Sequence, residues 1–147
     1  MNLVYSPITE CDDSEIQQII EEYRKPQISQ FISIDELKYF DYIVNTAATE
    51  FYKVYFKNEL VATVHIEISE NVLYLALVTF VKHQRKGYAT QIVKDLQTGL
   101  SRSTCNIIKV SIDKNNVASI RLFEKMQFVH NGTDEGLLNY SYRFPEV

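Results

Sequence analysis

The chain has 147 residues, of which 46% are hydrophobic and 23% charged, and its formal net charge is −4. This composition fits one globular domain spanning 1–147 and excludes a disordered or low-complexity chain. The small negative charge argues against a nucleic-acid-binding protein. The sequence has neither a signal peptide nor an apolar run near the roughly 18–20 residues of a membrane span, so we expect a cytoplasmic protein without a membrane partner.

Cysteine and histidine are too few and too scattered to predict a metal centre. Cys11 and Cys105 lie far apart in the sequence, and the histidines at positions 65, 83 and 130 share no ligand spacing. Two reduced thiols are usual in a cytosolic protein. We therefore expect neither a disulfide nor a bound metal.

The first part of the chain predicts a short strand followed by two helices. After the stretch NLVYSPI, Asp12 and Glu15 resemble a helix start, apolar residues recur at helical spacing, and Pro26 ends the pattern. Ser33 and Glu36 then match a capping box that precedes a second apolar stripe. These patterns predict one amphipathic helix before Pro26 and another after Ser33.

The middle of the chain predicts three strands joined by two tight hairpins. It is rich in β-branched and aromatic residues and is interrupted only at 57–59 and 69–71. In the middle strand, apolar residues alternate with Thr63, His65 and Glu67, so one face is apolar and the other mixed. The third strand is apolar throughout, which is typical of a central strand covered on both faces.

The second half predicts a helix to about Arg102, the strand CNIIKVSI, the Asn-capped helix NNVASIRLFEKMQF and a closing strand region around LLNYSYRF. The complete order predicts an α/β (α+β) fold. We expect helices packed around a mixed sheet, with an antiparallel first half and one right-handed β-α-β crossover.

The stretch HQRKGYATQIV stands where an apolar strand turns into a helix. A phosphate site needs main-chain N–H groups that converge at a helix N-terminus. Gly87 can adopt unusual backbone angles and Ala89 is small, while Gln84, Arg85 and Lys86 add donors and charge. By itself this pattern leaves open both a phosphate site and an ordinary charged surface turn.

Two motifs together resemble those of the GNAT family of N-acetyltransferases. Gln84, Gly87 and Ala89 match the acyl-CoA-binding pattern Q/R-x-x-G-x-G/A. The later pattern N-x-x-A/S-I-x-L-Y-E-K-x-G-F is matched at Asn116, Ser119, Ile120, Leu122, Glu124, Lys125 and Phe128. The order of elements is similar to that family over nearly the whole chain. The resemblance implies a mostly antiparallel sheet of six or seven strands, flanked by four helices and splayed between two central parallel strands.

The resemblance also implies acetyl-CoA as cosubstrate, with no metal, and direct acetyl transfer to a primary amine in a ternary complex. Main-chain amides of the glycine loop would hold the CoA pyrophosphate, and the end of the preceding strand would pair with the pantetheine arm. The residues expected to bind the cofactor are Thr79, Phe80, Val81, Gln84, Arg85, Lys86, Gly87, Tyr88, Ala89, Thr90, Asn116, Ser119 and Phe123. Asn116 can also serve as an ordinary helix N-cap.

The chain departs from the family pattern at two positions. Phe123 replaces a frequent Tyr that protonates the departing thiolate, so it can pack against the pantetheine but donates no proton. Gln127 replaces a Gly, which is a small cost if the turn there is left-handed.

Glu67 and His65 are candidate bases for the amine, because residues two apart on a strand share one face. Exposed strands also carry such residues without any catalytic role, so both interpretations stay open. A main-chain N–H near Val81 is a candidate donor to the thioester carbonyl. Tyr140 and Tyr142 are candidates for the acceptor site or for the core.

Two other functions fit the same residues. One is an acyl-CoA-binding module with little or no turnover, and the other is a protein N-terminal or lysine acetyltransferase. The sequence identifies neither the amine acceptor nor the base. We also expect a homodimer, because many proteins of this family pair.

Overall fold

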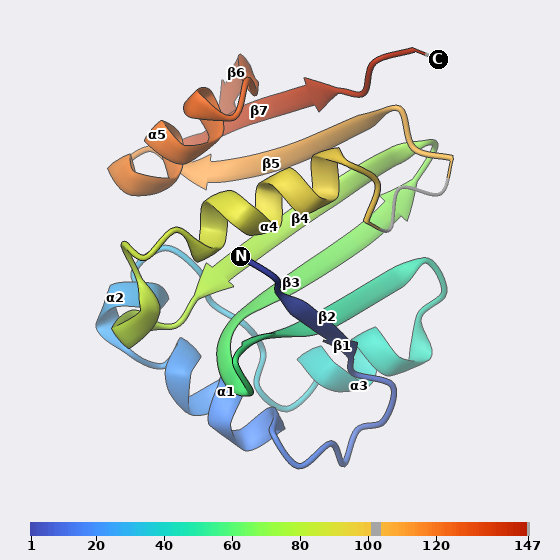
Figure 1. Cartoon of the computed structure of the whole chain (residues 1–147), viewed down its shortest axis with the longest axis vertical. Helices are drawn as coiled ribbons and strands as arrows, with labels where there is room; N and C mark the ends of the chain where they lie inside the picture. The colour runs from blue at the N-terminus through green and yellow to red at the C-terminus, as the bar shows by residue number, and fades with distance from the viewer. Residues whose placement is uncertain (101–103, 147) are drawn as a thin grey trace.

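A computed structural model describes residues 1–100 and 104–146 of the chain. One sheet of seven strands, in the order β1-β2-β3-β4-β5-β7-β6, runs through it (Figure 1). Neighbouring strands are antiparallel except for the central pair, β4 and β5, which is parallel. The expected mixed, mostly antiparallel sheet with one parallel pair is confirmed.

The elements follow in chain order. They are β1 Val4–Pro7, α1 Ile16–Tyr23, α2 Pro26–Ser29, α3 Tyr39–Asn45, β2 Thr49–Phe56, β3 Glu59–Ser69, β4 Val72–Thr79, the 3₁₀ turn η1 Val81–His83, α4 Tyr88–Gln97, β5 Ile107–Asp113, α5 Val117–Lys125, β6 Val129–Asp134 and β7 Leu137–Arg143. Five α-helices are thus described where four were expected, and α2 is a single turn. The helix predicted to reach Arg102 ends at Gln97, and Arg102 lies outside the described residues.

The two predicted hairpins between β2, β3 and β4 are confirmed. Lys57 and Asn58 form the first turn with φ of 49° and 65°, and Glu70 and Asn71 form the second with φ of 50° and 66°. Positive φ at both central residues matches the right-handed twist of the flanking strands, and Asn tolerates this conformation better than most residues. These short turns fix the register that aligns β3 with β4.

The predicted helix starts are wrong in detail. The residue before α1 is Glu15, which makes no side-chain cap, and it is Asp13 Oδ1 that accepts the N–H of Glu15 at 2.9 Å. Ser33 caps no helix, since α3 begins only at Tyr39. A Ser-x-x-Glu pattern is satisfied by turns as well as by helices, because short polar side chains bond their own backbone in either case.

Pro26 does more than end α1. It occupies the first turn of α2, where the missing N–H costs nothing and the fixed φ favours a helix. The chain therefore continues into a second helical turn, which carries Gln27 and Ile28 to the end of β4.

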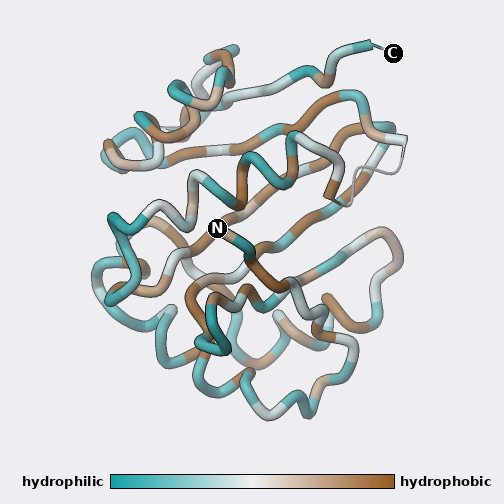
Figure 2. The backbone as a smooth tube through the Cα atoms, viewed as in Figure 1, coloured by the Kyte–Doolittle hydropathy of each residue, from teal (hydrophilic) through white to brown (hydrophobic). Residues whose placement is uncertain are grey.

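Hydrophobic clusters cover the two faces of the sheet. On one face, α4 and α5 pack buried residues such as Ile92 and Phe123 against β3, β4 and β5. On the other, α1 and α3 contribute Ile19 and Phe40 against β2, β3 and the end of β4 at Val78. Figure 2 shows the alternation of hydrophobic and hydrophilic residues along α4 that this packing requires.

The second face is covered unevenly. Tyr74 is 45% exposed and Ala76 is also exposed, so the expectation that β4 is covered on both faces is wrong for its first half. In Figure 1 the N-terminal helices gather at the lower side of the view, away from β5, β7 and β6 at the top. The half of the sheet formed by β5–β7 consequently shows a polar face beside β4.

The central strands part after a few residues. β4 pairs with β5 only from Val72–Tyr74 to Ile107–Lys109, whereas β5 pairs with β7 along its whole length. The expected splay is therefore present, and it opens toward the N-terminus of α4.

Candidate active site

The loop before α4 contains two residues in the left-handed region. Gly87, the residue preceding the helix, has φ of 89°, and Arg85 has φ of 62°. Gly adopts this conformation at little cost, whereas a residue with a Cβ loses roughly 1–2 kcal/mol there. The motif predicted the need for Gly87 but gave no sign of the strained Arg85.

The N-terminus of α4 presents free main-chain donors. Its first intrahelical bond runs from the N–H of Gln91 to the carbonyl of Gly87 at 3.1 Å, and no side chain caps the helix. The N–H groups of Tyr88, Ala89 and Thr90 consequently have no acceptor within α4. Together with the positive end of the helix dipole, they form the type of site that binds phosphate.

The charged side chains of this loop differ in their pairing. Lys82 and His83 both contact the carboxylate of Glu59, each at 2.9 Å. Within the described residues, Arg85 and Lys86 form no ion pair. Two cations thus stand beside free N–H groups with no protein anion to neutralise them.

A cavity of about 470 Å³ connects this loop to the splayed strands. It brings together most of the cofactor-binding residues predicted from the sequence: Thr79, Gln84, Arg85, Gly87, Tyr88, Ala89, Thr90, Asn116, Ser119 and Phe123. Phe80, Val81 and Lys86 do not line it. His83 and Leu122 also line the cavity, although no pattern in the sequence marked them as cofactor-binding residues.

The α2 region forms another wall of this cavity, with Gln27, Ile28, Gln30, Phe31 and Ile32. Its mixed composition alone could not have placed it opposite the glycine loop, because that contact depends on the packing of α1 and α2 against the sheet.

Some main-chain groups at the end of β4 point into the opening between β4 and β5, and others point toward β3. Phe80 N–H donates to the Val61 carbonyl at 2.9 Å, so it points toward β3. Since peptide groups alternate in direction along a strand, those of Leu77 and Thr79 point to the β5 side, where the strands have parted. Thr79 is therefore the best placed of the three predicted pantetheine partners.

The main-chain N–H of Val81 is already engaged. It donates to Glu22 Oε2 at 2.7 Å, and Glu22, which is only 8% exposed, also pairs with Lys25 at 2.8 Å. In this arrangement Val81 is not free to donate to a thioester carbonyl, as had been expected. No sequence signal connects Glu22 with Val81, because the contact joins two elements distant in the chain.

The α5 motif contributes packing and a helix cap. Asn116 is the N-cap, with its Oδ1 accepting the N–H of Ser119 at 3.3 Å, and it also lines the cavity. Phe123 is 3% exposed and packs edge-on against Phe128, with ring centroids 4.9 Å apart. Gln127 has φ of 70°, so the turn is left-handed as anticipated for this position.

The sequence profile described as "Acetyltransferase (GNAT) family" matches residues 16–128. The chain belongs to this family. A comparison with curated protein sequences gives no match.

Many solved structures share the GNAT fold of this chain. The N-acetyltransferase PseH of Campylobacter jejuni, solved with acetyl coenzyme A, is 13% identical with a TM-score of 0.77, over 97% of this chain and 99% of that one. The aminoglycoside N(6')-acetyltransferase of Legionella pneumophila is 14% identical with a TM-score of 0.78, over 96% and 91%. A chimera of the spermidine N-acetyltransferase SpeG from Vibrio cholerae and hSSAT is 16% identical with a TM-score of 0.76, over 97% and 96%.

The candidate bases, Glu67 and His65, do not line the cavity beside the loop that precedes α4. His65 Nδ1 shares a hydrogen bond of 2.6 Å with the hydroxyl of Tyr39, and Tyr42 donates to Glu67 Oε1 at 2.6 Å. His65 Nε2 is buried without a hydrogen bond, 3.8 Å from Glu67 Oε1. Burial lowers the pKa of His65, although Glu67 acts in the opposite direction, so its imidazole is neutral at pH 7.

A second cavity, of about 510 Å³, lies where β4 and β5 part. It is lined by Tyr74, Leu75, Ala76, Lys109, Val110, Ser111, Asn131, Asn139 and Tyr140. Of the two tyrosines considered for the acceptor site, Tyr140 lines this cavity, although its hydroxyl donates to Glu124 at 2.8 Å. Tyr142 packs against Phe128 and Phe144.

The candidate bases flank this second cavity. Glu67 pairs in register with Tyr74, and His65 with Ala76. Directly opposed residues on antiparallel strands have Cβ atoms about 4.5–5.5 Å apart, so both side chains stand next to lining residues. The described residues include no group of His, Cys, Asp or Glu that could hold a metal, and no helix among them is long and apolar enough to span a membrane.

Proposed function

We propose that this GNAT protein transfers the acetyl group of acetyl-CoA directly to a primary amine in a ternary complex. The free N–H groups of α4, beside the unpaired Arg85 and Lys86 and opening into the cavity along β4, carry this proposal. Acetyl-CoA supplies the activated acetyl thioester. The protein supplies the anion site, the groove and the surroundings of the amine.

The residues of the cavity have distinct roles. Arg85, Lys86 and the N-terminal amides of α4 neutralise the pyrophosphate, and the main chain of Thr79 extends the sheet by pairing with the amide-bearing arm. Asn116 and Phe123 form the opposite wall. Holding the two substrates in a reactive geometry contributes several kcal/mol to such a reaction without any catalytic side chain.

Glu67 is the better candidate base of the two. Both nitrogens of His65 are unavailable to a substrate, because Tyr39 occupies Nδ1 and Nε2 is buried. Glu67 is 41% exposed at its side chain and stands next to Tyr74 at the second cavity. We propose that Glu67 takes the ammonium proton, directly or through water, and that the Tyr42 hydroxyl, which donates to Glu67 Oε1, holds the carboxylate in place.

Phe123 cannot supply the proton that the family's tyrosine gives to the thiolate. A thiol of pKa about 8.5 leaves as a stable anion near neutral pH, so solvent can protonate it afterwards. The missing acid therefore costs less here than it would for an alkoxide leaving group.

The alternatives are a GNAT module that binds acyl-CoA without turnover, favoured only by Phe123, and an enzyme acting on protein N-termini or lysines. Spermidine and aminoglycosides, named for two of the structural neighbours, are small amines. They support a small acceptor over a protein.

The experiment combines calorimetry with a thiol assay. We expect CoA to bind, and acetyl-CoA to release free thiol only when a suitable amine is present, with the acetylated amine identified by mass spectrometry. Binding without thiol release from any small amine or peptide would favour the module. Absence of CoA binding at millimolar concentration would refute the proposal.

We also propose a single domain over 1–147, a cytoplasmic location and a homodimer. The exposed edge strand β6, which begins at Val129, and the exposed Leu137 of β7 support the dimer. Light scattering at micromolar concentration measures the mass directly, and a monomer would refute it.

A further inference from the structure

The second cavity has a charge pattern of its own. Lys109 projects from β5 on the polar face of the sheet, and no described residue forms an ion pair with it. None of the lining residues is Asp or Glu. Such a cavity repels a polycation, and its unpaired ammonium attracts an anion.

Neutral hydrogen-bonding groups surround Lys109. Ser111 Oγ donates to Asn139 Oδ1 at 3.0 Å, which leaves the Asn139 amide N–H groups available. Asn131 Nδ2 donates to Ser141 Oγ at 2.9 Å, which leaves its carbonyl oxygen available. These side chains are fixed by their mutual bonds and offer both donors and acceptors.

The strand register sets Lys109 at a definite distance from the proposed base. Glu67 pairs with Tyr74, and Tyr74 pairs with Lys109, so the three residues form one row across β3, β4 and β5. Residues in register point to the same face, and neighbouring strands lie about 4.8 Å apart. The backbones of Glu67 and Lys109 are therefore roughly 10 Å apart, with the ring of Tyr74 between them.

We infer that the second cavity binds the acceptor and that the acceptor is zwitterionic, with the amine near Glu67 and an anionic group, a carboxylate or a phosphate ester, at Lys109. This inference rests on the proposed acetyl transfer. Leu75 and Ala76 line this cavity and the next residue of β4, Leu77, lines the first one, so an amine held here would reach the thioester through the opening between β4 and β5. The anionic group fixes the acceptor while the ammonium loses one proton to Glu67 and the neutral amine attacks the thioester carbonyl; CoA leaves as the thiolate, which takes the second proton from the nitrogen through solvent.

The test compares amines that differ only in the anionic group. Thiol release from acetyl-CoA is measured with 4-aminobutyrate against butylamine, with phosphoethanolamine against ethanolamine, and with spermidine. We expect kcat/KM to be at least tenfold higher for one of the anionic partners over its matched amine, and spermidine to be a poor acceptor. The pair that shows the preference tells a carboxylate from a phosphate.

Lys109→Gln and Lys109→Glu then test the residue itself. A hydrogen bond to a charged group corresponds to about a tenfold to hundredfold change in affinity. We expect KM for the anionic acceptor to rise by that factor in Lys109→Gln, and Lys109→Glu to prefer the uncharged-tail amine or spermidine. CoA affinity, measured by calorimetry, remains unchanged in both, and Lys57→Gln in the first hairpin is the matched control.

These experiments distinguish a failure of this inference from a failure of the proposed acetyl transfer. Turnover with equal rates for each matched pair, or Lys109 variants that keep the wild-type preference, would overturn the inference and leave the acetyltransferase intact. Absence of CoA binding and of thiol release with every amine would overturn both.

Discussion

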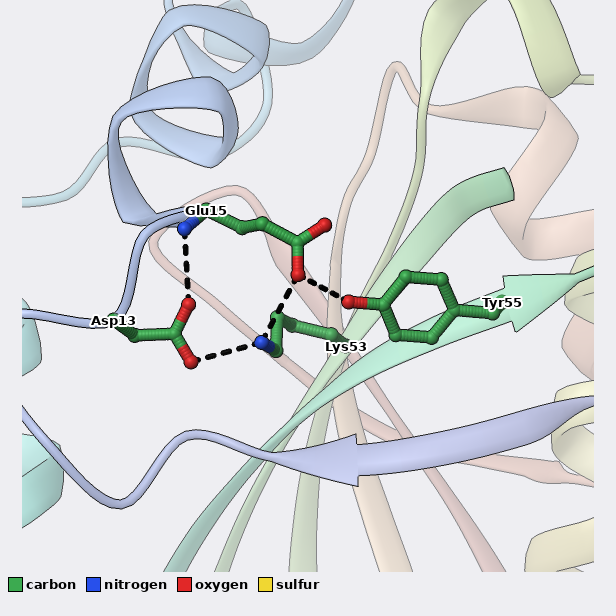
Figure 3. Close-up of polar contacts among 4 residues, drawn as sticks. All are labelled: Asp13, Glu15, Lys53 and Tyr55. Carbon is green, nitrogen blue, oxygen red and sulfur yellow. Dashed lines mark hydrogen bonds and ion pairs between the residues drawn. The ribbon is translucent and has the colours of Figure 1, made fainter. Parts of the chain in front are cut away.

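The cations of this protein fall into two groups that differ in their surroundings. Lys53 on β2 is buried, with its ammonium 2.8 Å from Asp13 and 3.1 Å from Glu15, and Tyr55 donates a hydrogen bond to the same Glu15 (Figure 3). Arg85 lines the first cavity, Lys86 follows it in the same loop, and neither forms an ion pair with a described residue. All three are basic residues near a helix N-terminus. Only Arg85 and Lys86 lack an ion-pair partner among the described residues and can therefore pair with an anionic ligand.

The pairing of Lys53 shows what a structural cation needs. Burial alone would lower the pKa of its ammonium, but the hydrogen bonds to Asp13 and Glu15 outweigh burial and raise it. The ion pairs attach the segment before α1 to the sheet. A positively charged residue therefore does not by itself predict an anion-binding site. Whether such a residue can bind an anion depends on how many partners its side chain already has in the protein.

The largest effect is expected from removing the buried cation. Lys53→Met should destabilise the fold by about 3 kcal/mol, because it leaves Asp13 and Glu15 without their counter-ion in a poorly hydrated place. Denaturant unfolding measures the change, with Lys57→Met at an exposed hairpin as control. An equal effect of the two substitutions would show that the Lys53 cluster is not structural.

The next prediction concerns the loop that holds the unpaired cations. Gly87→Val should abolish CoA binding, because a β-branched residue cannot adopt φ of 89° without moving the amides that follow. Wild-type protein at a CoA concentration of 100 times Kd should gain about 2.7 kcal/mol in stability, and the variant should gain none.

Gly87→Ala is the milder counterpart of this change. A Cβ there would approach only Met1 Cε, at 3.9 Å, so the backbone cost of about 1–2 kcal/mol remains without a clash. We expect weakened but measurable CoA binding. Full loss in the alanine variant would mean that backbone geometry alone, and not side-chain bulk, controls the site.

Arg85 and Gln127 allow a matched comparison of strain and charge. Both have left-handed backbones, with φ of 62° and 70°. Replacing either by Gly should stabilise the fold by up to about 1 kcal/mol. Only Arg85→Gly should weaken CoA binding, since it alone removes a cation from the cavity. Calorimetry and thermal unfolding of both variants check this, and equal CoA affinities would argue against a role for the Arg85 charge.

The smallest effect is expected in acid. Burial alone would raise the pKa of Asp13, but the Lys53 ammonium and the Glu15 N–H outweigh it and lower the pKa. Because the pKa is lower in the folded protein, its contribution to stability is present above the unfolded value of about 3.9 and is lost as the pH falls below it. Asp13→Asn should therefore flatten the fall in stability below pH 4, as measured by urea unfolding at several pH values. An unchanged slope would contradict this.

The sequence predicted the elements that follow from local rules. The two hairpins, the left-handed Gly87 and the Asn116 cap all depend on residues close together in the chain. The resemblance to the GNAT family then supplied the splay between β4 and β5, which no local pattern of these strands shows.

The parts that could not be predicted depend on contacts between distant residues. Glu22 reaches Val81 across the fold, and the row Glu67–Tyr74–Lys109 exists only through the register of three strands. At the misplaced helix start, Glu36 pairs with Arg24 instead of capping, and it is Asp35 Oδ1 that accepts a main-chain N–H, that of Leu37. The pairing of Lys53 with Asp13 and Glu15 likewise joins residues that are far apart in the chain.

The short pairing of β4 with β5 has a consequence for how the molecule folds. The strands β2–β4 form one set of sequence-local hairpins, to which β1 is added across the three N-terminal helices, and β6 and β7 form another that extends to β5. The ladder between the two sets rests on the three paired positions from Val72 to Tyr74. Local pairs close quickly, and contacts that span a long loop form late. We therefore expect the two sets to join after the hairpins within each have closed, so that the cavity for the acyl donor exists only once they have joined.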